Sequence, residues 1–251
     1  MKLFVLENKE ELGREAARLI AQRINEAVGR QGYARIVLST GASQFETLDA
    51  LTREKVDWSK VTMFHLDEYV GLPITHIASF RKYLTERVVD FVHPREAVFV
   101  SGEGDVRANI AALTRRLTEL PIDVGVIGIG ENAHIAFNDP PADFDTRESY
   151  IVVDLDENCK RQQVGEGWFS TVDEVPKQAI SMTPYRIMQC RCIVAPVPKA
   201  VKARAIAAVL GSEAVDPMIP GTLLKTHPDI SLFTDRDSIS LCGEDLIAKY
   251  R

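Results

Sequence analysis

The sequence predicts an α/β fold of the Rossmann-like type, with a doubly wound, mostly parallel sheet and helices on both faces. Five short runs are rich in Val, Ile, Leu and Phe, and their apolar residues are nearly continuous, as in parallel strands covered on both faces. Segments with helical periodicity lie between them, and this alternation implies right-handed β-α-β crossovers. The predicted strands span residues 34–40, 61–67, 122–129, 191–197 and 230–235.

The elements follow in order along the chain. A strand is expected within the first few residues, and a helix should begin after Asn8, where Asn8 and Glu11 form an Asn-x-x-Glu start. Its apolar face consists of Leu12, Ala16, Leu19, Ile20, Ile24 and Ala27. A second helix is predicted over 105–120, with Val106, Ile110, Leu113, Leu117 and Leu120 at helical spacing.

One domain is expected over residues 1–251, because no internal repeat, low-complexity tract or Pro/Gly/Ser-rich linker interrupts the pattern. The stretch 154–177 differs from the rest: it is polar, contains glycine and lacks a strand-like run. Such a segment between regular elements predicts a mobile lid over a site.

Composition excludes several classes of function. The formal charge is −6 and no polybasic run occurs, which argues against a nucleic-acid or anionic-membrane binder. The four cysteines show no paired spacing, so buried reduced thiols and a cytoplasmic protein are expected. The chain has no signal-peptide core and no apolar run of about 18 residues.

Motifs for metals and nucleotides are also missing. The five histidines and four cysteines fit no metal-ligand spacing, and no Gly-x-x-x-x-Gly-Lys-Ser/Thr loop occurs. GIGENA at 128–133 approaches the dinucleotide fingerprint, but Ala133 takes the place of the last glycine. We therefore expect neither a metal nor a cofactor.

Ligands of open parallel sheets bind at the carboxyl ends of the strands, so a binding site is expected among the residues that follow the predicted strands. The strand at 34–40 runs into Ser39-Thr40-Gly41-Ala42-Ser43, where small residues and hydroxyls allow a close approach to an anion. An ordinary strand-to-helix turn is the plain alternative.

Two adjacent carboxylates, Asp67 and Glu68, follow the strand at 61–67. One is expected to cap a helix or pair with a cation. The other would then face the crevice, where burial could tune it for proton transfer.

The strand at 122–129 is followed by His134 and, five residues later, Asp139. A lone histidine is usually structural, but imidazole is also the natural proton shuttle near neutral pH. Three such strand ends around one crevice indicate proton transfer on a phosphorylated small molecule.

These segments resemble a known family. STGAS, FHLDEYVGL, GIGENAHIAFNDP, VPKA and THPDISLFTD are similar, in this order, to the glucosamine-6-phosphate deaminases, also called isomerases, of the 6-phosphogluconolactonase superfamily. The resemblance implies aldose-ketose isomerisation with loss of the 2-amino group, without cofactor. It assigns Asp67 as the base, His134 to ring opening and Asp139 to orienting the histidine; the loop 39–43 and Lys199 would hold the phosphate.

Several positions depart from the family pattern. Asn132 and Ala133 stand where many members have aspartate and glycine, and Asp139 replaces a glutamate. In the lid, EGWF replaces a segment resembling SRFF, so Gly167 stands where an arginine would contact phosphate. Lys160 and Arg161 are the nearest replacements in sequence.

Two other functions are compatible with this fold. A 6-phosphogluconolactonase would share the fold, but DEYVGL and HIAFN favour the deaminase branch. A sugar-phosphate sensor without catalysis would leave the proton-transfer residues unexplained. The sequence leaves open the gluco or galacto configuration of the substrate, a non-amino sugar phosphate, allosteric regulation and assembly into a homo-oligomer.

Overall fold

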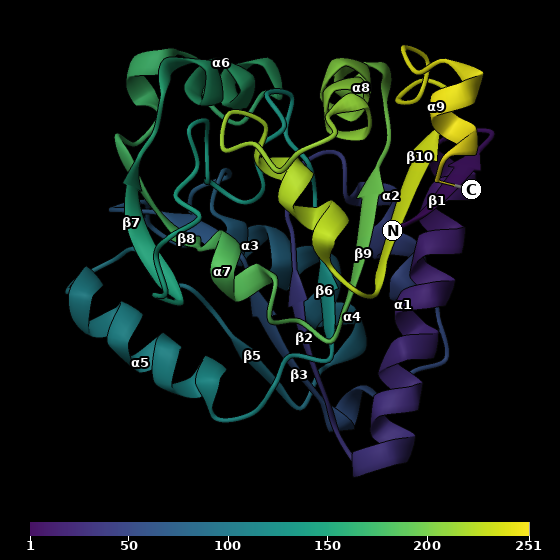
Figure 1. The fold of residues 1–251 in the computed structure, drawn as a ribbon. Helices are drawn as coiled ribbons and strands as arrows, with labels where there is room; N and C mark the ends of the chain where they lie inside the picture. Colours follow the sequence, from purple (N-terminus) through teal and green to yellow (C-terminus); the bar gives the residue numbers. More distant parts are fainter. Residues whose placement is uncertain (251) are drawn as a thin grey trace.

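The computed structural model describes residues 1–250, and its central sheet confirms the predicted α/β architecture (Figure 1). Seven strands, all parallel, follow the order β1-β10-β9-β6-β2-β3-β5. Their bounds are β1 (Lys2–Leu6), β2 (Ala34–Leu38), β3 (Val61–His65), β5 (Glu96–Val98), β6 (Val124–Val126), β9 (Cys192–Val197) and β10 (Ile230–Asp235). All five predicted runs are strands of this sheet, while the short edge strand β5 was not predicted.

Helices cover both faces of the sheet, as predicted, and each face has its own apolar core. One core involves α1 (Lys9–Gln31), α2 (Phe45–Leu51), α3 (Phe80–Leu84) and the π-helical turn η2 (Thr85–Val89). The other involves α5 (Val106–Thr118), α7 (Pro184–Ile187), α8 (Ala203–Gly211) and η5 (Pro220–Thr226). Four further helical segments are η1 (Trp58–Lys60), α4 (Asp90–Val92), η4 (Ala200–Lys202) and α9 (Glu244–Ala248), and two more lie in the segment 154–177. No helix of residues 1–250 has the length and apolar character needed to cross a membrane.

The predicted start of the first helix is confirmed in detail. Asn8 is the N-cap of α1, and its Oδ1 accepts a hydrogen bond from the backbone N–H of Glu11 at 2.9 Å. The Glu11 carboxylate accepts from the Glu7 backbone N–H at 2.9 Å, one residue before the cap. Gly32 ends the helix in the left-handed region, at φ 83°.

The structure corrects the bounds of two predicted strands, one of which is followed by a second, antiparallel sheet. This second sheet pairs β4 (Asp67–Tyr69), β8 (Gln178–Met182) and β7 (Tyr150–Asp154) in the order β4-β8-β7. The predicted strand 61–67 therefore stops at His65, and Asp67 begins a strand of the other sheet. The predicted strand 122–129 shortens to Val124–Val126, because the chain turns out of the sheet into a glycine-rich loop. The partner of β4 lies more than a hundred residues away, so no local pattern marked this pairing.

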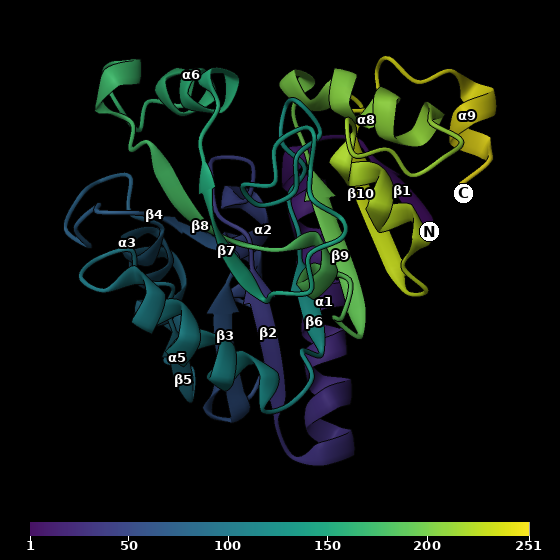
Figure 2. The same ribbon diagram turned by 60° about the vertical axis from the view of Figure 1, so that its left-hand side comes forward.

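The predicted lid segment carries helical structure. It contains α6 (Glu157–Gly165), capped by Asp156, and the turn η3 (Val172–Glu174). In both views, α6 and α8 lie at the same end of the molecule, the end towards which the parallel strands point (Figures 1 and 2). The lid segment thus lies at the carboxyl ends of the strands, where ligands of this architecture bind.

Candidate active site

The three predicted strand ends meet in one pocket, which we call the inner pocket. It lies at the carboxyl ends of the neighbouring strands β6, β2 and β3, beneath residues of α6. Its volume is about 70 Å³. The lining residues are Ser39, Thr40, Gly41, Ser43, Leu66, Asp67, Phe80, Gly128, Ile129, Gly130, His134, Ala136, Phe137, Gln162, Gln163, Glu166 and Lys202.

Asp67 presents a buried carboxyl group to this pocket. Its side chain forms no ion pair within 4 Å and accepts no hydrogen bond in the part of the chain that the structure describes. Burial, reinforced by the neighbouring Glu68, raises the pKa of Asp67 to about 8. A carboxyl group with that pKa exchanges protons near neutral pH, which suits a general acid-base catalyst.

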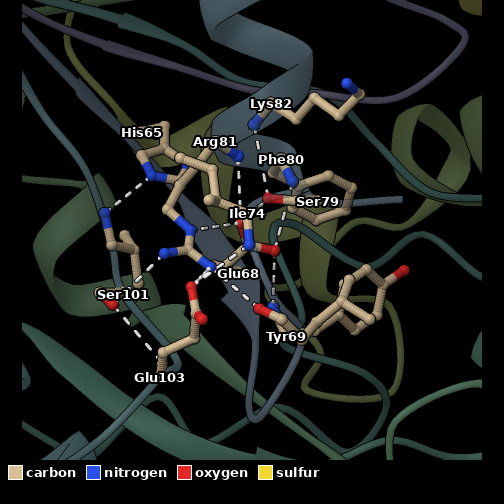
Figure 3. Close-up of polar contacts among 12 residues, drawn as sticks. His65, Glu68, Tyr69, Ile74, Ser79, Phe80, Arg81, Lys82, Ser101 and Glu103 are labelled. Atoms are coloured by element: carbon tan, nitrogen blue, oxygen red, sulfur yellow. Dashed lines mark hydrogen bonds and ion pairs between the residues drawn. The ribbon is translucent and has the colours of Figure 1, made fainter. Parts of the chain in front are cut away.

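Glu68, the next residue, is fully buried, and its carboxylate lies among groups of the fold that donate hydrogen bonds to it (Figure 3). Its carboxylate accepts hydrogen bonds from the backbone N–H groups of Tyr69, Phe80 and Arg81 and from the Ser79 hydroxyl. The Arg81 guanidinium adds a buried ion pair at 3.1 Å. Of the two adjacent carboxylates, Glu68 therefore caps α3 and pairs with a cation, while Asp67 faces the pocket.

His134 and Asp139 lie together in the loop after β6. His134 Nδ1 is 2.9 Å from Asp139 Oδ1, which also accepts a hydrogen bond from Asn132 Nδ2 at 2.9 Å. Burial alone would raise the pKa of Asp139, but the contacts with His134 and Asn132 outweigh it and lower this pKa. The aspartate thus stays ionised and holds the imidazole, despite being shorter than the glutamate of the family pattern.

The backbone of this loop makes room for the imidazole. A Cβ atom on Gly130 would lie 2.2 Å from His134 Nε2, so only glycine allows the ring to occupy this place. Ala133 has φ 67°, in the left-handed region that glycine adopts without strain. The chain keeps this conformation although alanine replaces the glycine expected from the family.

Ser181 on β8 connects two of the strand ends, and no sequence motif indicated this role. It stands opposite Asp67 in the antiparallel register. Its hydroxyl accepts hydrogen bonds from the Phe137 backbone N–H at 3.1 Å and from Asn138 Nδ2 at 3.2 Å. The small sheet thereby fixes Asp67 relative to the histidine loop.

The loop of Ser39, Thr40, Gly41, Ala42 and Ser43 forms another wall of the site, with Ala42 on its outer side. The Ser39 hydroxyl is buried and has no hydrogen-bond partner within residues 1–250. Gly41 has φ 97°, and its carbonyl accepts a hydrogen bond from the Tyr83 hydroxyl at 2.9 Å. An unsatisfied buried hydroxyl beside a glycine is what an anion-binding loop would offer.

Two lysines approach this loop in different ways. Lys199, predicted to bind phosphate, donates from Nζ to the Ala42 carbonyl at 2.6 Å and lines a second, outer pocket. Lys202, which the sequence analysis missed, is buried and lines both pockets. Its ammonium group has no hydrogen bond or ion pair among the residues described, and burial lowers its pKa. The stretch AVKARAI indicates a helix, but its spacing does not show whether the lysine is buried or solvated.

The outer pocket has a volume of about 570 Å³ and adjoins the inner pocket. Its lining residues are Ala42, Ser43, Glu131, Asn132, Asn158, Arg161, Gln162, Gly165, Glu166, Lys199, Val201 and Lys202. Of the two cations proposed to replace the lid arginine, Arg161 reaches this pocket, whereas Lys160 pairs with Glu157 at 3.2 Å. Across residues 1–250, no group of three or more His, Cys, Asp or Glu side chains could hold a metal ion.

The chain is similar to known proteins along most of its length. The family described as glucosamine-6-phosphate isomerases/6-phosphogluconolactonase matches residues 7–232. A glucosamine-6-phosphate deaminase of Streptococcus sanguinis (strain SK36) is 32% identical over 243 residues, which cover 96% of this chain and 99% of that protein. One from Lactobacillus delbrueckii subsp. bulgaricus (strain ATCC BAA-365 / Lb-18) is 31% identical over the same shares of both chains.

Solved structures show the same fold. A monomeric glucosamine-6-phosphate deaminase superposes with a TM-score of 0.88 at 28% identity, covering 96% of this chain and all of that one. A 6-phosphogluconolactonase from Shewanella baltica OS155 gives a TM-score of 0.77 at 19% identity, covering 94% and 97% of the two chains. The second similarity concerns the fold alone. The chain therefore belongs to the family of glucosamine-6-phosphate isomerases and 6-phosphogluconolactonases.

Proposed function

We propose that the protein converts an amino-sugar 6-phosphate into the ketose 6-phosphate and ammonia, without a cofactor. The substrate would be glucosamine 6-phosphate, giving fructose 6-phosphate, or its galactosamine equivalent. The observation that carries this proposal is that the buried carboxyl of Asp67, which has no ion-pair partner among residues 1–250, lies in the same pocket as His134, and that His134 pairs with Asp139.

Asp67 is the base that moves a proton between C2 and C1 of the open-chain sugar. Its ionised form takes the C2 proton, and the resulting acid returns it to C1 from the same side. This aldose-ketose shift turns the C2 amine into an iminium group, which water hydrolyses to the ketone with release of ammonia. The desolvated site makes the carboxylate a stronger base than aspartate in water, as its raised pKa indicates.

His134 assists the opening of the sugar ring. An imidazole can take the proton of the C1 hydroxyl and deliver it to the ring oxygen, a task suited to a pKa near neutrality. Asp139, held by Asn132, orients the ring and stabilises its protonated state. Neither ring opening nor the proton shift between C2 and C1 requires a metal ion or a cofactor.

The phosphate end of the substrate is assigned to the glycine loop and the lysines. The Ser39 hydroxyl and Gly41 border the inner pocket, and Lys202, whose ammonium has no partner among residues 1–250, lines the same space. Lys199 holds the loop through the Ala42 carbonyl and adds positive charge at the outer side. A lysine ammonium binds phosphate as a point charge, without the bidentate geometry of arginine.

The lid has to move for this reaction. The adjoining outer pocket of about 570 Å³ can hold part of a hexose phosphate, whereas the inner pocket, at about 70 Å³, holds only a few water molecules and is too small for the part of the sugar that would react. Residues 162, 163 and 166 of the lid segment form part of its wall. We propose that the segment 154–177 opens to admit the sugar and closes over it to exclude water.

The test is product formation from glucosamine 6-phosphate and galactosamine 6-phosphate, measuring ammonia together with the ketose 6-phosphate. Glucosamine without phosphate is the matched control, and it should react at least about a hundredfold less efficiently if the phosphate end is recognised. Hydrolysis of 6-phosphogluconolactone, assayed in parallel, tests the alternative activity. Binding of these phosphates without any turnover would overturn the proposal and favour a sugar-phosphate sensor.

A further inference from the structure

A lid carboxylate, Glu166, lies at the place where the proposed function puts the substrate phosphate. Glu166 follows the last residue of α6 and lines both the inner and the outer pocket. A Cβ atom built on Gly41 would lie 3.8 Å from Glu166 Oε2. The carboxylate therefore rests against the glycine loop that is open to an anion.

Glu166 is held there by two hydrogen bonds from the lid itself. Its Oε1 accepts from Gln162 Nε2 at 2.8 Å, and its Oε2 accepts from Trp168 Nε1 at 3.0 Å. The Trp168 ring packs edge-on against Tyr83, with ring centroids 6.2 Å apart, and the Tyr83 hydroxyl donates to the Gly41 carbonyl. The indole thus fixes the carboxylate relative to the loop.

Lys202 lines the same two pockets as Glu166. This buried lysine has no carboxylate within ion-pair distance in the described chain, and Glu166 is the charged group that most favours its protonated form. The site therefore contains a carboxylate supplied by the lid, which rests against the glycine loop and shares both pockets with a buried cation.

We infer that Glu166 is a specificity-determining residue that competes with phosphate for the anion site. A phosphate against Gly41 would lie next to the Glu166 oxygens, and like charges at that distance repel strongly in a partly desolvated site. Phosphate binding consequently requires displacement of the carboxylate, which raises the KM for a phosphorylated sugar. This inference rests on the proposed phosphate site and deepens it. It concerns the lid segment in which Gly167 stands in place of an arginine, and it names the lid residue that lies at that site.

The test compares Glu166→Gln with the wild type by calorimetric titration of the full chain with inorganic phosphate at fixed ionic strength. Removing the charge while keeping the side-chain size should tighten phosphate binding by roughly tenfold. Glu157→Gln is the matched control: Glu157 lies at the other end of α6, is largely exposed and pairs with Lys160. It removes the same net charge and should leave phosphate affinity within about twofold.

Steady-state kinetics with the amino-sugar phosphate give a second readout. Glu166→Gln should lower KM by a similar factor while kcat changes less, since the carboxylate does not touch the reacting carbons. Equal or weaker phosphate binding by Glu166→Gln, an equal gain in Glu157→Gln, or no phosphate binding by either protein would overturn the inference. The titration needs no turnover, so its result is separate from the fate of the proposed reaction.

Discussion

The neighbouring residues Asp67 and Glu68 carry the same chemical group into two opposite environments. Glu68 accepts hydrogen bonds from three backbone N–H groups, a hydroxyl and a guanidinium (Figure 3). Asp67, one residue earlier and also buried, has no such partner among residues 1–250, and its pKa is raised to about 8. The Glu68 carboxylate stabilises the fold, whereas the Asp67 carboxylate destabilises it and is available for chemistry.

The difference arises because the chain passes from the parallel sheet to the small antiparallel sheet between β3 and Asp67. The chain leaves the parallel sheet after His65, so side chains alternate across the small sheet from Asp67 onwards. Alternation sends Asp67 into the pocket and Glu68 towards the start of α3. The local cost of an unpaired carboxyl is thus offset by a well-satisfied neighbour.

The largest loss of stability is expected at Glu68. Glu68→Gln leaves the buried guanidinium of Arg81 without its buried counter-charge and should lower the free energy of unfolding by about 3 kcal/mol. Glu103→Gln is the control, because Glu103 contacts Arg81 at 2.8 Å but is 43% exposed. Its cost should stay below about 1 kcal/mol. Similar losses for both variants in urea unfolding would show that burial does not distinguish the two partners.

A substitution of His134 tests whether ring opening and the proton shift are carried out by two different groups, His134 and Asp67. His134→Gln should reduce kcat by about a hundredfold for the cyclic substrate, because general acid-base assistance to ring opening is lost. An open-chain analogue of the same phosphate should be affected far less. Single-turnover rates with both compounds provide the measurement, and equal losses would assign His134 a role after ring opening.

An effect of opposite sign to that at Glu68 is expected for the stability of Asp67→Asn. The pKa of the Asp67 carboxyl is about 8 in the folded chain, but in the unfolded chain it has its ordinary value of 3.8. Between these values the folded state binds more protons, so the free energy of unfolding falls as pH rises. Asp67→Asn should therefore be more stable than the wild type by on the order of 5 kcal/mol at pH 8, and by less than about 1 kcal/mol near pH 4. A gap that does not change with pH would contradict the raised pKa.

Much of this arrangement could be predicted from local patterns, and the rest depends on distant contacts. Near-continuous apolar runs identified the parallel strands, and the Asn8 start of α1 was predicted from its capping residues. The adjacency of Asp67 and Glu68 predicted opposite directions, but only the pairing of β4 with β8 decides which one enters the pocket. Lys202 escaped prediction because helix periodicity does not distinguish a buried cation from a solvated one.

The turnover of Asp67→Asn tests the central claim most directly. Ammonia release from glucosamine 6-phosphate should fall by about a thousandfold relative to the wild type, because the amide cannot accept the C2 proton. Substrate binding, followed by calorimetry, should be retained, and the melting temperature should equal or exceed that of the wild type. Turnover within tenfold of the wild type by this well-folded variant would contradict the assignment of Asp67 as the base.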